Sequence, residues 1–596
     1  MSAKQNNKIR KNNSIFQAIP QHYNTRNETH VKLPREQYTS LKVVLICTFI
    51  IYIPSLFNQF VNWDDPAFFL ENPAIVNATS NNVLQSIVAL FSTTVTGGYT
   101  PLVTVSFLFE KLLWGFDNSF FWHLDNLLLH LLCTWLVYKI CGRLKFSATV
   151  CFITALLFGI HPMHVESVVW ITERKDLLYT AFSFIAIIWY MRYHEDVSQK
   201  RPIYWAYTFF TLALLSKIQA VTLPFILLLI DYLKNDTLNR KMVLNKISFF
   251  LLSILIGTLG ILFLKQNSVL VANNVLSFPQ HLVVAAYLVV VYLLKSIVPY
   301  RMVPIYPYPT MIEWYMYASL LVVPILIYIT YRAWKRNNRV VVFGLLFFIC
   351  NVFFVLQIIT AGQGYMSDRY SYLSYIGLFL IYATYFEKAL KYFPGRERKI
   401  KIAGGLYVLI LILFSILQML VWQNSEVLWR YVLKYYKNQS TAFYNLAMYY
   451  HKDGKQAEAI EYLDKAIKIE PQNAELYQNR ADIYFEMSGD DKNVLQKALA
   501  DCNKAISLNN HTARYYANRA NVYGKMGNLD SALLDVNKCI LLDSNNARAY
   551  YTRYMIHMQQ AHYDDAINDV AKYLEVDPDN VEMQNQFRRM KMYPGR

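Results

Sequence analysis

The stretch ARYYANRANVYGKMGNLDSALLDVNKCILLDSNN, residues 513–546, decides the fold of the C-terminal part of this chain. Positions 8 and 20 of this stretch are Ala520 and Ala532. Their small side chains let two helices approach closely, and aromatic residues at positions 4 and 11 fill the space to the next hairpin. The same pattern recurs in the 34-residue units 440–473 and 547–580 and in the unit 474–512, which is five residues longer. It predicts four stacked helical hairpins over 440–580, followed by a C-terminal tail at 581–596.

A helical-hairpin period of this length is the signature of tetratricopeptide repeats (TPRs). Arrays of such hairpins form a curved solenoid with a concave groove, and each hairpin buries its apolar face only against its neighbours. We therefore expect the groove over 440–580 to bind a polypeptide. A module for stability or dimer contact is the alternative.

The sequence before the repeats has the composition of a membrane protein. The whole chain is 55% hydrophobic, 16% aromatic and only 17% charged, whereas a soluble domain has about 25% charged residues. An all-α, polytopic helical bundle of about eleven spans is predicted over 41–421, joined by a connecting helix at 422–439 to the repeats. Eleven apolar runs approach the length needed to cross the hydrocarbon layer: 41–57, 123–140, 146–160, 177–191, 203–216, 219–233, 247–264, 313–331, 340–359, 370–386 and 402–421.

The distribution of basic residues predicts the topology. Residues 1–437 contain 39 Lys and Arg, of which 28 fall in the segments that eleven spans place on the side of the N-terminus. Because basic loops usually face the cytoplasm, we expect residues 1–40 to be a disordered cytoplasmic tail. An odd number of spans then places the TPR domain on the periplasmic or lumenal side. If a twelfth apolar run, 281–298, also crossed the membrane, the basic loops that follow it would lie on the outer side. We therefore expect 281–298 to be interfacial or re-entrant. No basic stripe accompanies a nucleic-acid-binding motif, which argues against a nucleic-acid partner.

The predicted outer loop, 58–122, carries five acidic residues and one basic residue. Asp64 and Asp65 lie directly after the first span. Two adjacent carboxylates at a membrane interface suit a general base or a metal ligand. Asp before Pro66 also suits an ordinary turn.

A second polar cluster contains His161, His164 and Glu166 at the end of the predicted third span. Ionisable residues near a span are candidates for function because they are costly to bury. A metal such as zinc, or helix capping and interface anchoring, would also suit these residues. We expect His161, His164 and Glu166 to contribute to a site for the donor phosphate and sugar, and we predict no metal there.

Four basic residues are expected at the outer boundary: Arg174, Lys175, Lys217 and Arg369. Such side chains can hold the phosphate of a lipid whose tail lies in the bilayer, or can pair with nearby acids. Tyr306 and Tyr308 can stack on a sugar ring or anchor the interface. The sequence contains no Walker loop and no G-x-G-x-x-G motif, so a soluble nucleotide-sugar donor is not supported.

Eight motifs are spread over the chain: NWDD at 62–65, YTPL at 99–102, FWHLDNLLLH at 121–130, HPMHVES at 161–167, RKDLL at 174–178, LSK at 215–217, YPYP at 306–309 and DRYSYL at 368–373. Together these motifs resemble the transmembrane-and-TPR family, relatives of the protein O-mannosyltransferases with the GT-C fold. The resemblance covers about 50–580 and includes both halves in the same order. Two positions depart from the family pattern, namely Thr100 where Arg is expected and Ile218 where Glu is expected.

The resemblance implies a catalytic first outer loop, with Asp64 or Asp65 as its acidic residue, and dolichyl or undecaprenyl phosphate as the sugar carrier. The expected reaction is inverting transfer of a hexose such as mannose to Ser or Thr of an exported protein recruited by the TPR groove. Arg174 and Arg369 would stabilise the leaving phosphate. No cofactor is required by the sequence, although a divalent cation could assist.

Two rival functions remain open at this point. The acceptor could be a lipid-linked glycan instead of a protein, or the spans could merely anchor a non-enzymatic TPR scaffold. The expected location is the bacterial inner membrane, or the endoplasmic reticulum membrane in a eukaryote.

Overall fold

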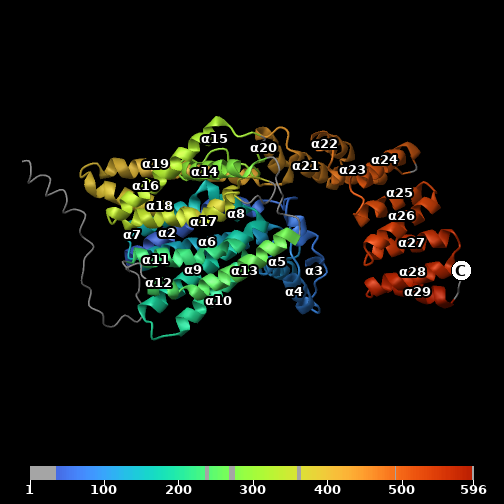
Figure 1. Ribbon diagram of the computed structural model, residues 1–596, viewed down its shortest axis with the longest axis horizontal. Helices are drawn as coiled ribbons and strands as arrows, with labels where there is room; N and C mark the ends of the chain where they lie inside the picture. Colours follow the sequence, from blue (N-terminus) through green and yellow to red (C-terminus); the bar gives the residue numbers. More distant parts are fainter. Residues whose placement is uncertain are drawn as a thin grey trace, which may run out of the picture.

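The computed structural model describes residues 35–592, except 235–239, 267–275, 310, 359–363 and 490. In this part of the chain every named element is helical, and β-pairing is limited to two isolated bridges. Figure 1 shows a bundle of long helices on the left and a curved stack of hairpins, α21 to α29, on the right. The all-helical fold, with a membrane-type bundle followed by a TPR solenoid, is confirmed.

The bundle begins at α2. Its α-helices are α2 (Arg35–Tyr52), α3 (Pro73–Val76), α4 (Val83–Ser92), α5 (Pro101–Trp114), α6 (Phe120–Arg143), α7 (Ala148–Ile160), α8 (Val165–Val169), α9 (Arg174–Glu195), α10 (Arg201–Ser216), α11 (Leu223–Leu233), α12 (Arg240–Leu244), α13 (Ile247–Gln266), α14 (Phe278–Lys295), α15 (Trp314–Ala318), α16 (Val322–Lys335), α17 (Arg339–Val352), α18 (Ser371–Tyr392), α19 (Glu397–Val421) and α20 (Ser425–Tyr435).

Short 3-10 or π-helical turns connect several of these helices, among them η3 (Pro66–Leu70), η4 (Pro162–His164), η5 (Ile171–Glu173), η6 (Ile218–Thr222) and η9 (Asp368–Tyr370).

Each of the eleven predicted runs contains helix, but the number of spans is not confirmed. Among the described residues, five helical stretches are long and apolar enough to cross a membrane, or six if the bent pair formed by 148–160 and 162–169 is one span. One of the five is α14, so length and composition do not separate it from the spans. Its interfacial placement stays a prediction based on charge alone.

The centre of the bundle is closely packed. A Cβ atom added at Gly344 on α17 would lie 2.4 Å from the carbonyl oxygen of Gly377 on α18, so these two helices can only approach this closely without side chains there. The contact keeps α18 in place, and the loop before α18 carries Arg369.

The repeats form four hairpins. Their helices are α21 (Ser440–Lys452), α22 (Gln456–Ile469), α23 (Ala474–Met487), α24 (Lys492–Leu508), α25 (Ala513–Lys525), α26 (Leu529–Leu542), α27 (Ala547–Gln559) and α28 (Tyr563–Val576). Within three hairpins an Arg of the first helix pairs with an Asp of the second: Arg480 with Asp501 at 2.7 Å, Arg519 with Asp535 at 2.7 Å, and Arg553 with Asp569 at 2.6 Å.

The described parts of both predicted tails are helical. Residues 1–34 of the tail predicted at 1–40 lie outside the described residues, and α2 already begins at Arg35. The segment 581–596 was expected to be a tail but contains α29 (Val581–Met592). Met583 and Met590 of α29 are buried against the last hairpin, so α29 closes the apolar end of the solenoid.

The first hairpin shares the hydrophobic core of the bundle. Leu446 and Leu463 belong to the same buried cluster as Trp422 and Trp429 at the junction between the two parts. The solenoid is therefore attached through packed side chains and not only through a linker.

Candidate functional site

The site is built around the loop that follows α2, where the two acidic residues face in different directions. Asp65 is buried and accepts hydrogen bonds from the Val61 backbone N (2.9 Å), from Trp170 Nε1 (3.0 Å) and from the Thr172 hydroxyl. Burial raises the pKa of Asp65 to about 6, although these hydrogen bonds oppose the shift. The carboxylate of Asp65 thus holds the loop in place against the 170–172 segment.

Asp65→Ala is expected to destabilise the folded protein. The substitution leaves the donors of Trp170 and Thr172 buried without an acceptor, at about 1–3 kcal/mol for each. Thermal unfolding of the purified protein in detergent would measure the change. Asp64→Ala is the matched control and should unfold near the wild-type temperature, because Asp64 makes only a 3.9 Å ion pair with Lys175. Equal unfolding temperatures for the two variants would contradict the structural role of Asp65.

Glu173 is the centre of an ionic network. Its carboxylate lies 3.2 Å from Lys175 Nζ, 3.2 Å from Lys217 Nζ and 3.2 Å from Arg369 Nε. Burial alone would raise the pKa of Glu173, but the three neighbouring cations hold it well below its ordinary value. Glu173 therefore fixes side chains from α9, from the end of α10 and from η9 at one point.

Two further carboxylates complete the buried side of this network. Glu166 pairs with Arg369 Nη1 and also accepts a hydrogen bond from the Ser367 hydroxyl at 2.9 Å. Asp176 lies 2.7 Å from Lys217 Nζ. Both acids are buried, and buried charges of this kind persist only when they are paired.

The accessible edge of the network is formed by three side chains. Exposed fractions are 24% for the side chain of Asp64, 17% for Arg369 and 12% for Lys175, compared with 2% for Glu173. A ligand can therefore reach one carboxylate and two cations, while the buried acids hold those cations from behind. Lys217 lies deeper, between Glu173 and Asp176.

Arg174 does not belong to this edge, contrary to the expectation that it holds a phosphate. Its guanidinium is buried, 2.6 Å from Glu110 of α5. It also donates to Asn126 Oδ1 at 2.7 Å and to the Trp122 carbonyl at 3.1 Å. Arg174 joins α5, α6 and α9, so its role in the structure is to fix the outer loop.

His161 and His164 are also placed differently from the expectation of an accessible ligand pair. Both are fully buried, and their rings lie near Tyr375 and Phe379 of α18 at centroid distances of 5.2–6.1 Å. His161 Nδ1 accepts from the Met163 backbone N at 3.3 Å, and His164 Nδ1 lies 2.9 Å from the Phe158 carbonyl. Both residues pack inside the bundle and do not join Glu166 at an open site.

The two tyrosines are likewise engaged in the structure. The hydroxyl of Tyr306 is buried and lies 2.9 Å from Asp368, which in turn pairs with Lys295 at 2.9 Å. The hydroxyl of Tyr308 donates to Gln357 at 2.8 Å. Tyr306 therefore holds the 366–370 loop and presents no free face to a sugar.

The predicted site residues did not include Glu173 and Asp176, and Trp170 and Thr172 were not predicted as partners of Asp65. The available signal was the dense charged run Glu173-Arg174-Lys175-Asp176 directly before a predicted span, where unpaired charges are costly.

Comparison with known proteins supports a relationship in both halves. A family model described as dolichyl-phosphate-mannose-protein mannosyltransferase matches residues 107–264, and two tetratricopeptide-repeat models match 447–488 and 513–546. Protein O-mannosyl-transferase TMTC1 of Mus musculus is 37% identical over 95 residues, which are 16% of this chain and 10% of that protein. The resemblance to the transmembrane-and-TPR family is confirmed.

A second relative is likewise matched over a small part of its length. Protein O-mannosyl-transferase F38B6.6 of Caenorhabditis elegans is 27% identical over 169 residues, 26% of this chain and 23% of that protein. The chain thus covers less than a quarter of the length of each of these two relatives. Among solved structures, the crystal structure of MamA is 26% identical with a TM-score of 0.24, covering 26% of this chain and 87% of that one.

Proposed function

We propose that this protein is a membrane glycosyltransferase that transfers a hexose, with inversion, from a polyprenyl-phosphate carrier to Ser or Thr hydroxyls of a protein on the outer side of the membrane. The observation that carries the proposal is the accessible edge formed by Asp64, Lys175 and Arg369 above a base of buried carboxylates. The match to a dolichyl-phosphate-mannose-dependent family favours mannose as the hexose.

Asp64 is the proposed general base. It is more accessible than Asp65 and makes one long ion pair, so a hydroxyl can reach its carboxylate. Burial raises the pKa of Asp64, although the charge of Lys175 opposes the shift. A raised pKa makes a carboxylate a better proton acceptor. As the hydroxyl oxygen bonds to the anomeric carbon of the sugar, its proton passes to Asp64.

Arg369 and Lys175 are the proposed partners of the leaving phosphate. The bond between the anomeric carbon and the phosphate oxygen breaks, and the lipid phosphate leaves with the electron pair. Glu166 and Glu173 hold Arg369 in a fixed position before the reaction. Preorganised cations of this kind stabilise developing negative charge without reorganisation at the moment of reaction.

The lipid chain of the carrier has a candidate location in an apolar cavity of the helical bundle. An apolar cavity of about 1030 Å³ is lined by residues of α11, α14, α16 and α17, including Leu228, Val289, Ile327 and Ile349. The lining helix α11 follows Lys217 through η6. We propose that a polyprenyl tail occupies this cavity while its phosphate lies at Arg369.

We propose that the TPR solenoid recruits the acceptor, because its first hairpin is hydrogen-bonded to the loop that carries Asp64. The side-chain amide of Asn62 donates to the Asn445 carbonyl on α21 at 2.7 Å, and Trp429 Nε1 donates to Asn62 Oδ1 at 2.9 Å. Trp63 stacks on Trp170 at a centroid distance of 4.5 Å. A polypeptide held at the first hairpin would therefore lie close to the loop that carries the proposed base.

Transfer can be tested with the full-length protein reconstituted in liposomes. Dolichyl-phosphate-linked radiolabelled mannose and a lumenal protein fraction from cells that lack this protein would be supplied. We expect label on Ser or Thr with inverted anomeric configuration. Label only on a glycolipid would support the lipid-linked-glycan alternative, and no label above a heat-inactivated control would contradict the proposed reaction with this donor.

Exchange of the outer repeats tests the role of the solenoid. Replacing residues 474–592 by the repeats of an unrelated TPR protein preserves the first hairpin, which shares the core of the bundle. We expect the set of modified proteins to change while donor binding stays constant. Intact-mass comparison of exported proteins would measure this, and an unchanged acceptor set would contradict recruitment by the groove.

A further inference from the structure

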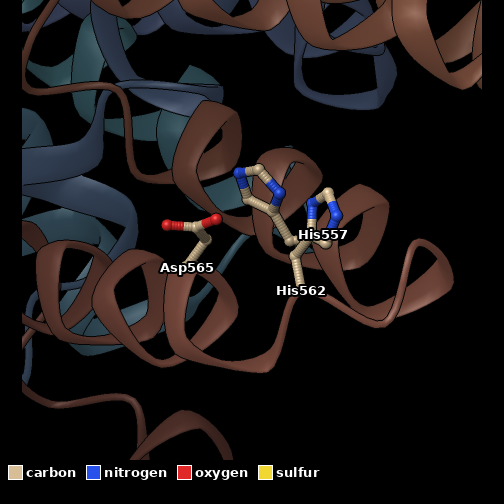
Figure 2. A group of neighbouring side chains, drawn as sticks. All are labelled: His557, His562 and Asp565. Atoms are coloured by element: carbon tan, nitrogen blue, oxygen red, sulfur yellow. The ribbon is translucent and has the colours of Figure 1, made fainter.

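The last TPR hairpin contains a cluster of potential metal ligands far from the proposed catalytic network. His557 lies in the last turn of α27, His562 directly precedes α28, and Asp565 lies in its first turn. One ligand atom from each residue lies within 4.8 Å of the other two. Figure 2 shows the three side chains gathered between the end of α27 and the start of α28. Elsewhere in the described part of the chain, no other group of three His, Cys, Asp or Glu residues meets this spacing.

His557 departs from the repeat pattern. It occupies position 11 of the fourth repeat, where the three preceding repeats carry Tyr450, Tyr484 and Tyr523. An aromatic side chain at this position packs between hairpins. Its replacement by an imidazole, five residues before a second His, is not explained by the packing requirement of the solenoid.

The contacts of His557 differ between its two ring nitrogens, and Nδ1 is the one that could bind a metal ion. Nε2 lies 3.7 Å from Asp569 Oδ2, and Asp569 is itself held by Arg553. Nδ1 is buried and has no hydrogen-bond partner. A metal-binding His usually directs its other nitrogen toward a carboxylate, which fixes the ring orientation and the tautomer. Asp569 lies on the Nε2 side of the ring, so the tautomer with its proton on Nε2 would leave the lone pair of Nδ1 available to a metal ion.

We propose that His557, His562 and Asp565 bind a divalent transition metal ion, with zinc as the best match. Two imidazoles and one carboxylate are zinc ligands, at bond lengths of about 2.0–2.2 Å. Such bonds place the ligand atoms of a tetrahedral site roughly 3.4 Å apart. His562 and Asp565 are exposed, so small rotations of their side chains close the distance.

Three protein ligands leave one tetrahedral position for water or for a ligand from a partner protein. The metal would connect the end of α27 to the start of α28. It would thereby stiffen the hairpin against which α29 packs, and it would present an open coordination site at the outer end of the solenoid. This inference is independent of the glycosyl-transfer reaction.

The test uses full-length protein purified without a polyhistidine tag and stripped of metal with a chelator. Zinc retained after equilibration with zinc chloride and desalting is measured by mass spectrometry, together with the visible absorption of the cobalt-substituted protein. We expect one zinc per chain in the wild type, a tetrahedral cobalt spectrum, and at least a tenfold loss of affinity in His562→Ala and in Asp565→Asn.

His511→Ala is the matched control, because His511 is an exposed His at a turn between repeats. It should bind zinc like the wild type, and zinc should raise the unfolding temperature of the control but not of His562→Ala. Zinc binding that is equal in the wild type, His562→Ala and Asp565→Asn, or absent from all of them, would overturn the assignment.

Discussion

Asp64→Asn should lower the rate of sugar transfer by about 10²–10⁴-fold, the usual contribution of a general base. The amide has nearly the same shape as the carboxylate but cannot accept the hydroxyl proton. The ion pair lost with Lys175 is long and partly exposed, so insertion and folding should be unaffected. Initial rates with the dolichyl-linked donor in liposomes would measure the effect.

The matched control is Asp117→Asn, which removes an exposed carboxylate from the same outer loop. It should transfer sugar at the wild-type rate. Because burial raises the pKa of Asp64, the wild-type rate should decline on acidification at a higher pH than the ordinary Asp value. Wild-type activity in Asp64→Asn would remove Asp64 from the mechanism.

Arg369→Ala is expected to abolish transfer and to destabilise the protein. The substitution removes the proposed phosphate ligand and takes one cation from each of the buried carboxylates Glu166 and Glu173. Removing one partner of a buried ion pair costs about 3–5 kcal/mol. Transfer rates and thermal unfolding would both be measured. Arg430→Ala is the control, since Arg430 pairs with the partly exposed Glu426 on α20 and should change stability by about 1 kcal/mol or less.

Arg369→Lys separates binding of the phosphate from structural support. Lysine keeps the charge near the buried acids but lacks the planar fork that binds phosphate through two hydrogen bonds. We expect folded protein with a raised KM for the lipid donor. A folded Arg369→Lys variant with wild-type kinetics would show that Arg369 supports the fold without contacting the donor.

The repeats could be predicted well because their information is local. Each 34-residue unit carries its own small and aromatic positions, and each hairpin packs only on its neighbours. The α29 helix was missed because it lies beyond the last full period. Met583 and Met590 of α29 are buried only because they pack on the apolar end of the fourth hairpin, and the sequence alone does not show this contact.

The charged residues of the bundle were identified as a group, but their individual roles could not be read from the sequence. Arg174 and Lys175 are neighbours at the start of α9, and successive helical residues point about 100° apart. Arg174 consequently meets Glu110 of α5, while Lys175 meets Glu173 and Asp64. The acids of α5 and of the first outer loop are distant in sequence.

The roles of His161 and His164 likewise could not be predicted from the sequence alone. Locally they form a polar cluster with Glu166, which is the pattern of a ligand site. The structure covers both rings with Tyr375 and Phe379 from α18, more than 200 residues later in the chain. Only tertiary packing separates these buried imidazoles from the neighbouring Glu166, which pairs with the accessible Arg369.

The most direct measurement is an electron cryomicroscopy structure of the full-length Asp64→Asn variant with the lipid-phosphate-linked sugar bound. The proposed mechanism predicts the phosphate at Arg369 and Lys175, the lipid chain in the cavity lined by α11, α14, α16 and α17, and the anomeric carbon turned toward position 64. A donor phosphate bound elsewhere, with position 64 facing bulk water, would contradict it.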